Sequence, residues 1–470
     1  MLPYEVLFFA LLFFILGIFF FNLNLGILIF VFNFLIFLIF LVSFLVLKSK
    51  KFLYFAFLSF LILVGALYVS FYSNSFYFNS QKNISGEIKG LITKIISFEP
   101  TLFFVVQNSL GNFLVQLPST SFLKEGNEIV FSGKKGKLET LPVYFQKEKL
   151  IAYYPFPQII KVEESKSFQG QLLKLKTNLV SKIKLFLPRK EADFLAGLLF
   201  GEKNNFSPDF KLAMKKSGTT HLVALSGYNI SIVVMFFMMI FTSFLPRFLS
   251  IFGSVLGVVS FVIMTAGESS VMRAAIMGIL ILLAEERGSL FDVRNIIVLS
   301  AFLMLIFNPY LLVFDVGFEL SFLALVGIVY LKPLLFYEDK KEVQEESLFS
   351  WKEAMRTTFA AQILVFPLLL HTFGYFSFSS FLSNVLILWL IPLTMFLGFL
   401  SVGMGIISQF LGMVFSLLVF PLLKIETLVI EFFGGLNLGL QWKVGFWFFV
   451  VYYLILGILI LWRRKFIKIF

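Results

Sequence analysis

A short run in the middle of the chain, residues 221–230, places polar side chains inside sequence that is apolar enough to span a bilayer. His221, Ser226 and Asn229 are the polar side chains of interest, and Gly227 lies between the last two. A polar group costs free energy in lipid, so such side chains normally face a protein-lined interior or a water-filled path. The run therefore indicates a polar interior within a membrane-embedded domain.

His221 and Ser226 could also be a base and a nucleophile. Their spacing of five residues puts them well apart around a helix, and no acid stands close in sequence to orient the imidazole. We favour a different role for Ser226-Gly227, in which the pair breaks or tightly packs a helix and exposes backbone groups toward a cavity. A membrane-embedded hydrolase remains the alternative.

Further polar residues follow in the apolar sequence, namely Arg273, Asp315, Glu319 and Gln362. A charge in hydrocarbon costs about 2.5–3.5 kcal/mol, so these groups need partners or water. Asp315 and Glu319 are four residues apart and would share a helix face, with Arg273 as a counter-ion for either. They either line one hydrated conduit with the run at 221–230 or form buried ion pairs that only fix helix packing.

The composition is that of a membrane protein: 59% of the residues are hydrophobic, 19% aromatic and only 14% charged. Apolar runs of about 20 residues recur along the chain, as spanning helices require. There is no cysteine, which excludes disulfides, thiolate catalysis and cysteine zinc sites. Two histidines cannot form a histidine-rich metal site, so no metal or other cofactor is expected.

The apolar runs predict a polytopic α-helical membrane protein of about twelve spans. The first three runs are residues 3–21, 25–47 and 52–71, and the others are 219–243, 248–266, 270–286, 295–312, 317–336, 354–372, 381–400, 403–431 and 443–461. The turn at Lys48, Lys50 and Lys51 is positive, which predicts a cytoplasmic turn and an extracytoplasmic segment after the third span. The positive residues after later alternate spans agree, and they put the C-terminus in the cytoplasm.

Between the third span and the later ones, residues 76–165 change character. Short runs alternate apolar and polar residues between glycine turns, and Tyr144-Phe145-Gln146 continues that pattern. This predicts about five strands in a small extracytoplasmic β-barrel domain of OB type, inserted after an N-terminal membrane segment, residues 1–75. Residues 76–190 hold 16 Lys and one Arg against eight Glu, so Lys134, Lys135 and Lys137 are candidate phosphate contacts. Ordinary solubility is the alternative reading of this charge.

Residues 166–190 predict an amphipathic helix that lies flat at the lipid headgroups. Its apolar face would hold Phe168, Leu172, Leu175, Leu179, Ile183 and Phe186. Lys174 and Lys182 lie on the other face, where they could meet a nucleic acid. Packing of this helix against the β domain is the alternative.

Several motifs are absent from the sequence. It has no GxxxxGK[ST] loop, no HExxH and no metal-nuclease histidine cluster. We therefore expect a protein that is not an enzyme and whose transport is driven from elsewhere.

Four blocks of sequence resemble the ComEC competence family, the DNA uptake channels of the inner membrane of naturally transformable bacteria. The blocks are residues 198–202 with 214–227, residues 270–277, residues 308–309 with 315–322, and Gln362, Pro367, residues 373–374 and residues 383–384. The resemblance implies that residues 191–470 form a competence-type channel domain. It also implies that one DNA strand passes an OB-type domain and then crosses a polar path. A DNA receptor and a cytoplasmic DNA translocase would be its partners, beside single-stranded DNA and the lipid bilayer.

Two departures from the family bear on function. Tyr228-Asn229 stands where many members have a second histidine after Ser-Gly, although Asn keeps a hydrogen-bonding group. Many members also carry a C-terminal metallo-β-lactamase-like domain, and this sequence ends after its last apolar run, so we expect a transport component without nuclease activity. A transporter of another substrate, a small solute or an anionic polymer, is the second reading of the same polar clusters.

Overall fold

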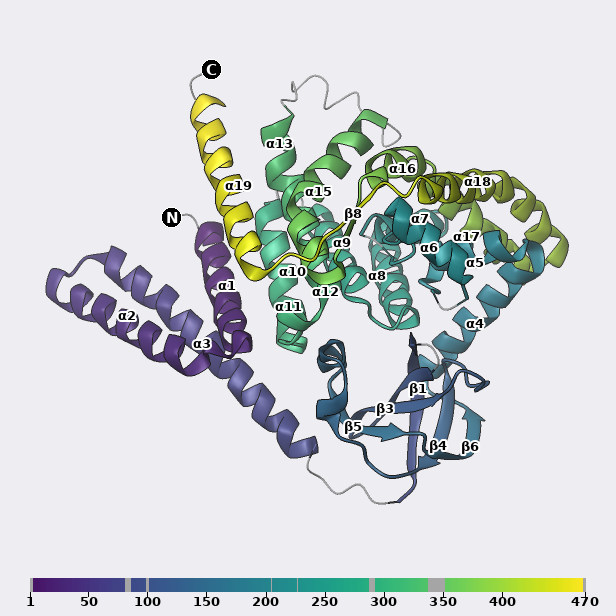
Figure 1. The fold of residues 1–470 in the computed structure, drawn as a ribbon, viewed down its shortest axis with the longest axis horizontal. Helices are drawn as coiled ribbons and strands as arrows, with labels where there is room; N and C mark the ends of the chain where they lie inside the picture. The colour runs from purple at the N-terminus through teal and green to yellow at the C-terminus, as the bar shows by residue number, and fades with distance from the viewer. Residues whose placement is uncertain are drawn as a thin grey trace. The chain divides into compact units, whose positions relative to one another are not determined.

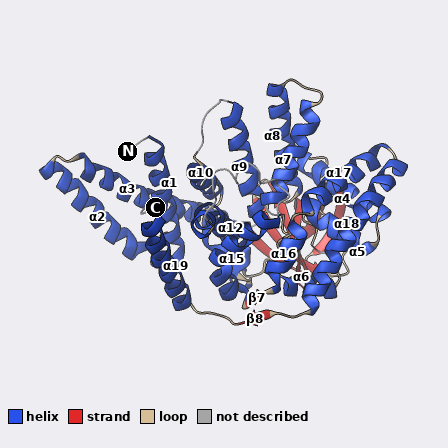
Figure 2. Ribbon diagram, turned by 90° about the horizontal axis from the view of Figure 1, so that it is seen from above, coloured by secondary structure: helices blue, strands red, loops and turns tan. Residues whose placement is uncertain are grey.

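The computed structural model of the protein describes residues 3–80, 86–98, 101–203, 205–225, 227–286, 292–336 and 351–467. Figure 1 labels the helices and strands of the chain, which forms two compact units. The first holds Met1–Leu175 and Val259–Phe318, and the second holds Lys176–Val258 and Glu319–Phe470. Among the described residues, helices dominate both units, and the strands form one main sheet and one short strand pair (Figure 2).

The first unit begins with three long apolar helices. They are α1 (Pro3–Phe20), α2 (Gly26–Leu47) and α3 (Lys50–Ser80), with the π-helical turn η1 (Phe21–Leu25) between α1 and α2. Two glycines let α1 and α3 touch backbone to backbone. A Cβ on Gly17 would lie 2.2 Å from the Ile62 carbonyl oxygen, and one on Gly65 would lie 2.3 Å from that of Phe14. A larger residue at either position would therefore push the two helices apart.

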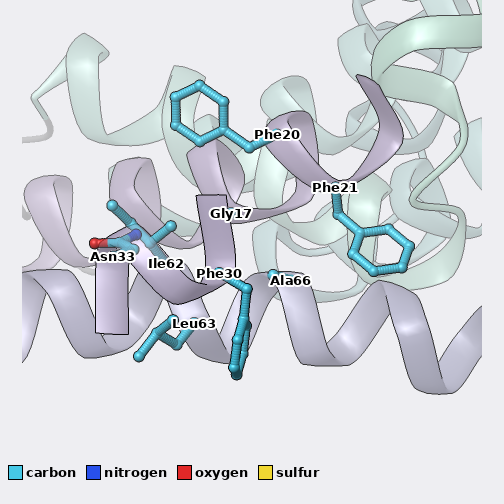
Figure 3. A pocket seen from close by; sticks show the side chains of 8 residues that line it. All are labelled: Gly17, Phe20, Phe21, Phe30, Asn33, Ile62, Leu63 and Ala66. Carbon is cyan, nitrogen blue, oxygen red and sulfur yellow. The ribbon is translucent and has the colours of Figure 1, made fainter. Parts of the chain in front are cut away.

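A small pocket opens between these helices (Figure 3). Its lining residues are Gly17, Phe20, Phe21, Phe30, Asn33, Ile62, Leu63 and Ala66. The Asn33 side chain is buried, and its Oδ1 accepts a hydrogen bond of 2.7 Å from the Ser59 hydroxyl. The one polar residue of the lining is thus satisfied within the helix pair, and the rest of the pocket is apolar.

The β domain of the first unit is a six-stranded sheet in the order β5-β3-β2-β1-β4-β6. Its strands are β1 (Ile88–Phe98), β2 (Thr101–Asn108), β3 (Gly111–Pro118), β4 (Asn127–Ser132), β5 (Leu150–Pro155) and β6 (Gln158–Glu164). β1, β2 and β3 form an antiparallel meander, β4 pairs antiparallel with β1 and with β6, and β5 pairs in parallel with β3. The alternation of apolar residues along each strand fills one core, which includes Ile92, Phe104, Phe113, Phe131 and Tyr154.

The predicted β segment is therefore present, with differences in its elements. α3 continues to Ser80, so the helix extends past residue 75, where the sequence places the start of the β domain. Tyr144-Phe145-Gln146, a predicted strand, lies instead in the 3₁₀ helix η3 (Val143–Glu148). Pro142 precedes η3 with a fixed φ, and Lys149 ends it in the left-handed region at φ 54°, so the backbone turns where a strand would run straight.

The helices that complete the first unit are α9 (Ser269–Glu286), α10 (Val293–Phe307) and the short α11 (Leu311–Phe314). α1 packs against α10, where the rings of Phe14 and Phe302 lie 5.3 Å apart edge to face. The side chain of Asn22 in η1 donates to the Pro309 carbonyl at 2.9 Å. These contacts join the N-terminal helices to α10 and α11.

The described part of the second unit consists of helices and one short strand pair. Its elements are α5 (Arg189–Phe200), α6 (Pro208–Ser217), α7 (Gly227–Thr242), η4 (Gly327–Leu331), α13 (Lys332–Leu335), α15 (Trp351–Phe373), β7 (Tyr375–Ser377), α16 (Ser379–Leu388), α17 (Ile391–Ile407), α18 (Gln409–Gly435), β8 (Gly439–Gln441) and α19 (Phe446–Ile467). Three helices cross from one unit to the other along the chain: α4 (Phe168–Phe186), α8 (Arg247–Met264) and α12 (Val316–Val326).

Helix α4 buries only part of the apolar face that the sequence predicts, together with residues next to that face. The buried residues of α4 are Gly170, Leu173, Lys176, Val180 and Ile183, of which Ile183 belongs to the predicted face. Phe168 and Leu175 of the predicted apolar face are 65% and 43% exposed. The reason is packing on protein: Leu173 contacts Gly126 of the β domain, and Phe186 lies against Gly405 and Gly412 of α17 and α18.

In the described part of the chain, six helices are long and apolar enough to cross a membrane. They are Tyr4–Leu23, Phe30–Leu47, Lys50–Asn74, Arg247–Met264, Val316–Leu335 and Gln409–Gly435. The pair α16 and α17 would be a seventh span, bent by 51°. The other apolar helices are shorter, so a helical membrane protein with a small β sheet is confirmed, whereas about twelve spans and a closed barrel stay predictions.

Candidate functional site

Asp315 is the most fully engaged of the predicted polar residues. It lies between α11 and α12 with an extended backbone, at φ −119° and ψ 97°, and is 4% exposed. Its Oδ1 accepts from Lys147 Nζ at 3.1 Å and from the Gly317 amide at 2.9 Å, and its Oδ2 accepts from the Ser269 hydroxyl. The carboxylate therefore has a cation and two hydrogen-bond donors, all within the first unit.

This geometry corrects two details of the sequence-based expectation. Because Asp315 is extended rather than helical, it does not share a helix face with Glu319, which lies half-buried on α12. The cation on Asp315 is Lys147 of the β domain, which was not predicted from the sequence. Arg273 is buried on α9, the helix whose first residue, Ser269, also donates to Asp315.

The run at 221–230 begins as a turn and continues as α7. His221 is exposed, and its Nδ1 lies 3.0 Å from the Gly218 carbonyl, so the imidazole contacts its own turn. Asn229 is 1% exposed and donates to the Leu222 carbonyl at 3.2 Å. Gly227 is the first residue of α7, and Ser226 falls outside the described residues. Asn229 thus satisfies a backbone carbonyl that the turn leaves without a helical partner.

Gln362 belongs to a cluster of hydroxyl groups around the end of α6. Its amide nitrogen donates to the Ser380 hydroxyl at 2.9 Å. The last carbonyls of α6 also accept from this region: Ser379 donates to Lys216 at 3.1 Å and Ser383 to Ser217 at 2.8 Å. The final carbonyls of a helix lack intrahelical donors, and these serines supply them.

The same cluster explains Gly218. Its backbone is left-handed at φ 72°, and a Cβ there would lie 2.2 Å from the Cβ of Ser380. Gly218 thus links two of the predicted residues: its carbonyl contacts the exposed His221, and it packs against Ser380, which accepts from Gln362. The sequence places these residues 141 positions apart; only packing brings them together.

The predicted phosphate contacts fall into two groups. Lys134, Lys135 and Lys137 are exposed in the connection after β4. Lys174 is paired with Glu164, and Lys182 donates to the Gly405 carbonyl at 2.7 Å. The two α4 lysines thus contact other groups of the chain, and the three in the β4–β5 connection lie at the surface of the β domain.

Glu426 is a further ionisable residue that was not predicted from the sequence. Glu426 lies in the apolar helix α18, is fully buried, and accepts from the Thr394 hydroxyl at 2.7 Å. An acidic residue inside a span-length apolar run is itself a signal of function or of a specific partner, and it could have been found in the sequence. No group of three potential metal-binding side chains occurs among the described residues.

The fold is that of a helical membrane protein that carries a small β domain, with buried polar residues in its helical part. The sequence model of the family described as Competence protein matches residues 198–466, more than half of the chain. The chain therefore belongs to the competence protein family, as its motifs indicate.

A relative of the chain is the ComE operon protein 3 of Bacillus subtilis (strain 168). The two are 28% identical over 249 residues, which cover 52% of this chain and 30% of that protein. The match thus spans less than a third of the relative's length. No solved structure matches the chain.

Proposed function

We propose that this protein is an inner-membrane channel for the uptake of single-stranded DNA in natural transformation. Membership of the competence family carries the proposal, because the matched region includes the candidate polar residues of the helical part from His221 to Gln362. A role in DNA uptake is what that membership indicates. The channel mechanism goes further and rests on the physical argument below.

The β domain would receive the strand. β1 pairs with both β2 and β4, and β3 pairs in parallel with β5, which supports an OB-type connectivity. The segment that follows β4 also bridges β5, through Gly136 and Tyr153. OB folds bind single strands by combining positive charge with exposed aromatic rings. Lys134, Lys135 and Lys137 would supply the charge, and Phe156, 56% exposed in the turn after β5, would supply a ring.

The polar residues of the helical part would form the path. About twelve spans, with the β domain outside and the C-terminus in the cytoplasm, would place the positive turn at Lys48, Lys50 and Lys51 inside. Arg273 would meet phosphates, Glu319 and Gln362 would keep the route hydrated, and Asp315 would be a structural member of the polar core. The protein would perform no chemistry on the strand, and would rely on a DNA receptor outside and on a translocase in the cytoplasm.

Uptake of labelled DNA by cells that carry Arg273→Ala tests this function. We expect at least about a tenfold loss of uptake, since a buried cation on the path would be removed. Arg247→Ala is the matched control, because Arg247 is an exposed arginine at the start of α8. Unchanged uptake with normally inserted Arg273→Ala protein would favour a transporter of another substrate.

A further inference from the structure

One face of the β domain is closed by the chain itself. The connection between β4 and β5 ends in residues 138–149, here called the strap, which include η3. Leu138, Leu141 and Phe145 of the strap pack on a second apolar cluster of the sheet, opposite its main core. The sheet residues under the strap are Phe103, Val105, Leu114, Leu150 and Tyr153.

This closed face is the one that OB folds generally use. Their oligonucleotide surface lies on strands 2 and 3, where aromatic rings stack on bases. Here Phe103 and Tyr153 are each 9% exposed, and the ring of Phe145 lies 5.3 Å from that of Phe103. The rings that could stack on bases are therefore already buried in the apolar cluster under the strap.

The strap is also held at its C-terminal end, in two directions. Glu148 holds it to the sheet: its carboxylate pairs with Lys94 at 2.8 Å and its carbonyl accepts from Asn112 at 2.7 Å. Lys147 holds it to the helices of the first unit. Its ammonium pairs with Asp315 at 3.1 Å, and its carbonyl accepts from the Asn308 side chain at 2.9 Å.

Lys149 adds a further attachment. Its ammonium donates to the Phe307 carbonyl at the end of α10 and lies 5.3 Å from the ring centroid of Tyr72 on α3. Burial lowers the pKa of Lys149, since water no longer solvates the charge fully. Three consecutive residues of the strap thus alternate between helices and sheet, and the Lys147–Asp315 pair is the most deeply buried of the contacts to the helices.

We propose that Lys147 is a positioning residue that fixes the β domain on α10 and α11 through Asp315, and that the strap stays closed over β2 and β3 while DNA passes. The strand is then met by the exposed connection at residues 134–137 and not by the β2–β3 face. Asp315 serves as the receptor for the β domain rather than as a contact for DNA. Only the statements about the strand rest on the proposed function; the docking stands without it.

Amide hydrogen exchange on the full chain tests the docking without DNA. The amides of Thr140, Leu141, Phe145 and Lys149 are hydrogen-bonded within the strap or at its start, so they report on whether it is closed. In Lys147→Met, Asp315 loses its cation, and we expect strap exchange at least about tenfold faster. Lys147→Arg should exchange like the wild type, because it keeps the charge and the reach.

Lys124→Met is the matched control, since Lys124 is an exposed lysine of the same domain. It should leave strap exchange unchanged. Equal exchange in Lys147→Met and the wild type would overturn the docking role. The docking role would also be overturned if Lys147→Arg exchanged as fast as Lys147→Met. In that case the positive charge would not be what holds the strap.

A covalent tether tests whether the strap stays closed. The chain has no cysteine, so Lys147→Cys with Asp315→Cys offers a bismaleimide two thiols and no others. We expect the tethered protein to take up DNA at the wild-type rate. If the untethered variant has lost uptake, the tether should restore it.

Loss of uptake on tethering, or failure of the tether to restore it, would overturn the closed strap. Uptake by none of the proteins, wild type included, would instead contradict the proposed function. The exchange experiment would still decide the docking in that case.

Discussion

Individual polar residues in the helical part are held by short, specific contacts. Asp315 has Lys147, Ser269 and the Gly317 amide, and Asn229 has the Leu222 carbonyl. Glu426 differs, because Oε2 of its carboxyl has no hydrogen-bond partner among the described residues. A buried carboxylate with one neutral donor lacks the partners that a full charge requires.

The contacts of Glu426 predict that its hydrogen-bonding oxygen, and not a negative charge, stabilises the fold. Glu426→Gln keeps a carbonyl oxygen for the Thr394 hydroxyl, so its free energy of unfolding should lie within about 1 kcal/mol of the wild-type value. Glu426→Ala leaves that hydroxyl without its acceptor and opens a cavity, and should cost about 2–4 kcal/mol. Thermal unfolding of the purified protein in detergent measures both. Equal damage by Gln and Ala would mean that the fold needs the charge.

Helices in this protein end and meet through a few small or polar residues. Serines from β7 and α16 cap the carbonyls of α6, and Gly405 and Gly412 leave room for the ring of Phe186 between α17 and α18. Each contact joins elements that are distant in sequence. The position of a helix therefore depends on residues of other helices and strands.

The start of α10 gives a prediction at this scale. Asp292 caps the helix by accepting from the Arg294 amide at 2.9 Å, and its carboxylate pairs with the Arg294 side chain at 2.6 Å. The Arg294 side chain holds the pKa of Asp292 below its usual value. A lowered carboxyl pKa stabilises the fold above the pKa of the unfolded chain, and this stabilisation is lost as pH falls through the folded value.

Asp292→Ala should therefore fray the first turn of α10 at neutral pH, at a cost of about 1 kcal/mol. Asp292→Asn should keep the cap and lose the pH dependence. Hydrogen exchange at residues 293–296, with each variant compared with the wild type at the same pH, measures the effect. A wild-type first turn that is equally protected at neutral pH and in acid would argue against a role for the charge.

At the scale of the whole molecule, the lysines of α4 and those of the β4–β5 connection lie in different surroundings. Those of α4 are engaged: Lys176 pairs with Glu202 at 2.8 Å and Lys184 with Asp193 at 3.1 Å, besides the contacts of Lys174 and Lys182. Lys134, Lys135 and Lys137 are exposed. The exposed lysines of this connection thus present positive charge at the surface of the β domain.

The salt dependence of binding measures this difference. Replacing Lys134, Lys135 and Lys137 with Ala should weaken binding of a single-stranded oligonucleotide to the full chain. It should also reduce the slope of log K against log salt by about 2, because each lysine that neutralises a phosphate of a single strand contributes about 0.7 to that slope. Lys182→Ala should leave the slope unchanged, because the Lys182 ammonium donates to the Gly405 carbonyl. An unaltered slope in the triple variant would remove the connection from the DNA path.

Local patterns in the sequence were enough for the membrane character, the family and the presence of a β domain after α3. The length of an apolar run and the alternation of residues in a strand reflect whether neighbouring residues face lipid, core or water. The length of the third apolar run did not locate the end of α3, which continues to Ser80. Alternation of residues also predicted a strand where the chain forms the 3₁₀ helix η3.

The partners of the polar residues were decided by tertiary structure. Lys147 meets Asp315 across 168 residues, the α6 carbonyls meet serines more than 150 residues away, and α4 buries the face that contacts protein. A charged or polar side chain shows in the sequence that it needs a partner. Which group meets that need is set by long-range packing, where many residues of the right chemistry compete and only the fold brings one within hydrogen-bond distance.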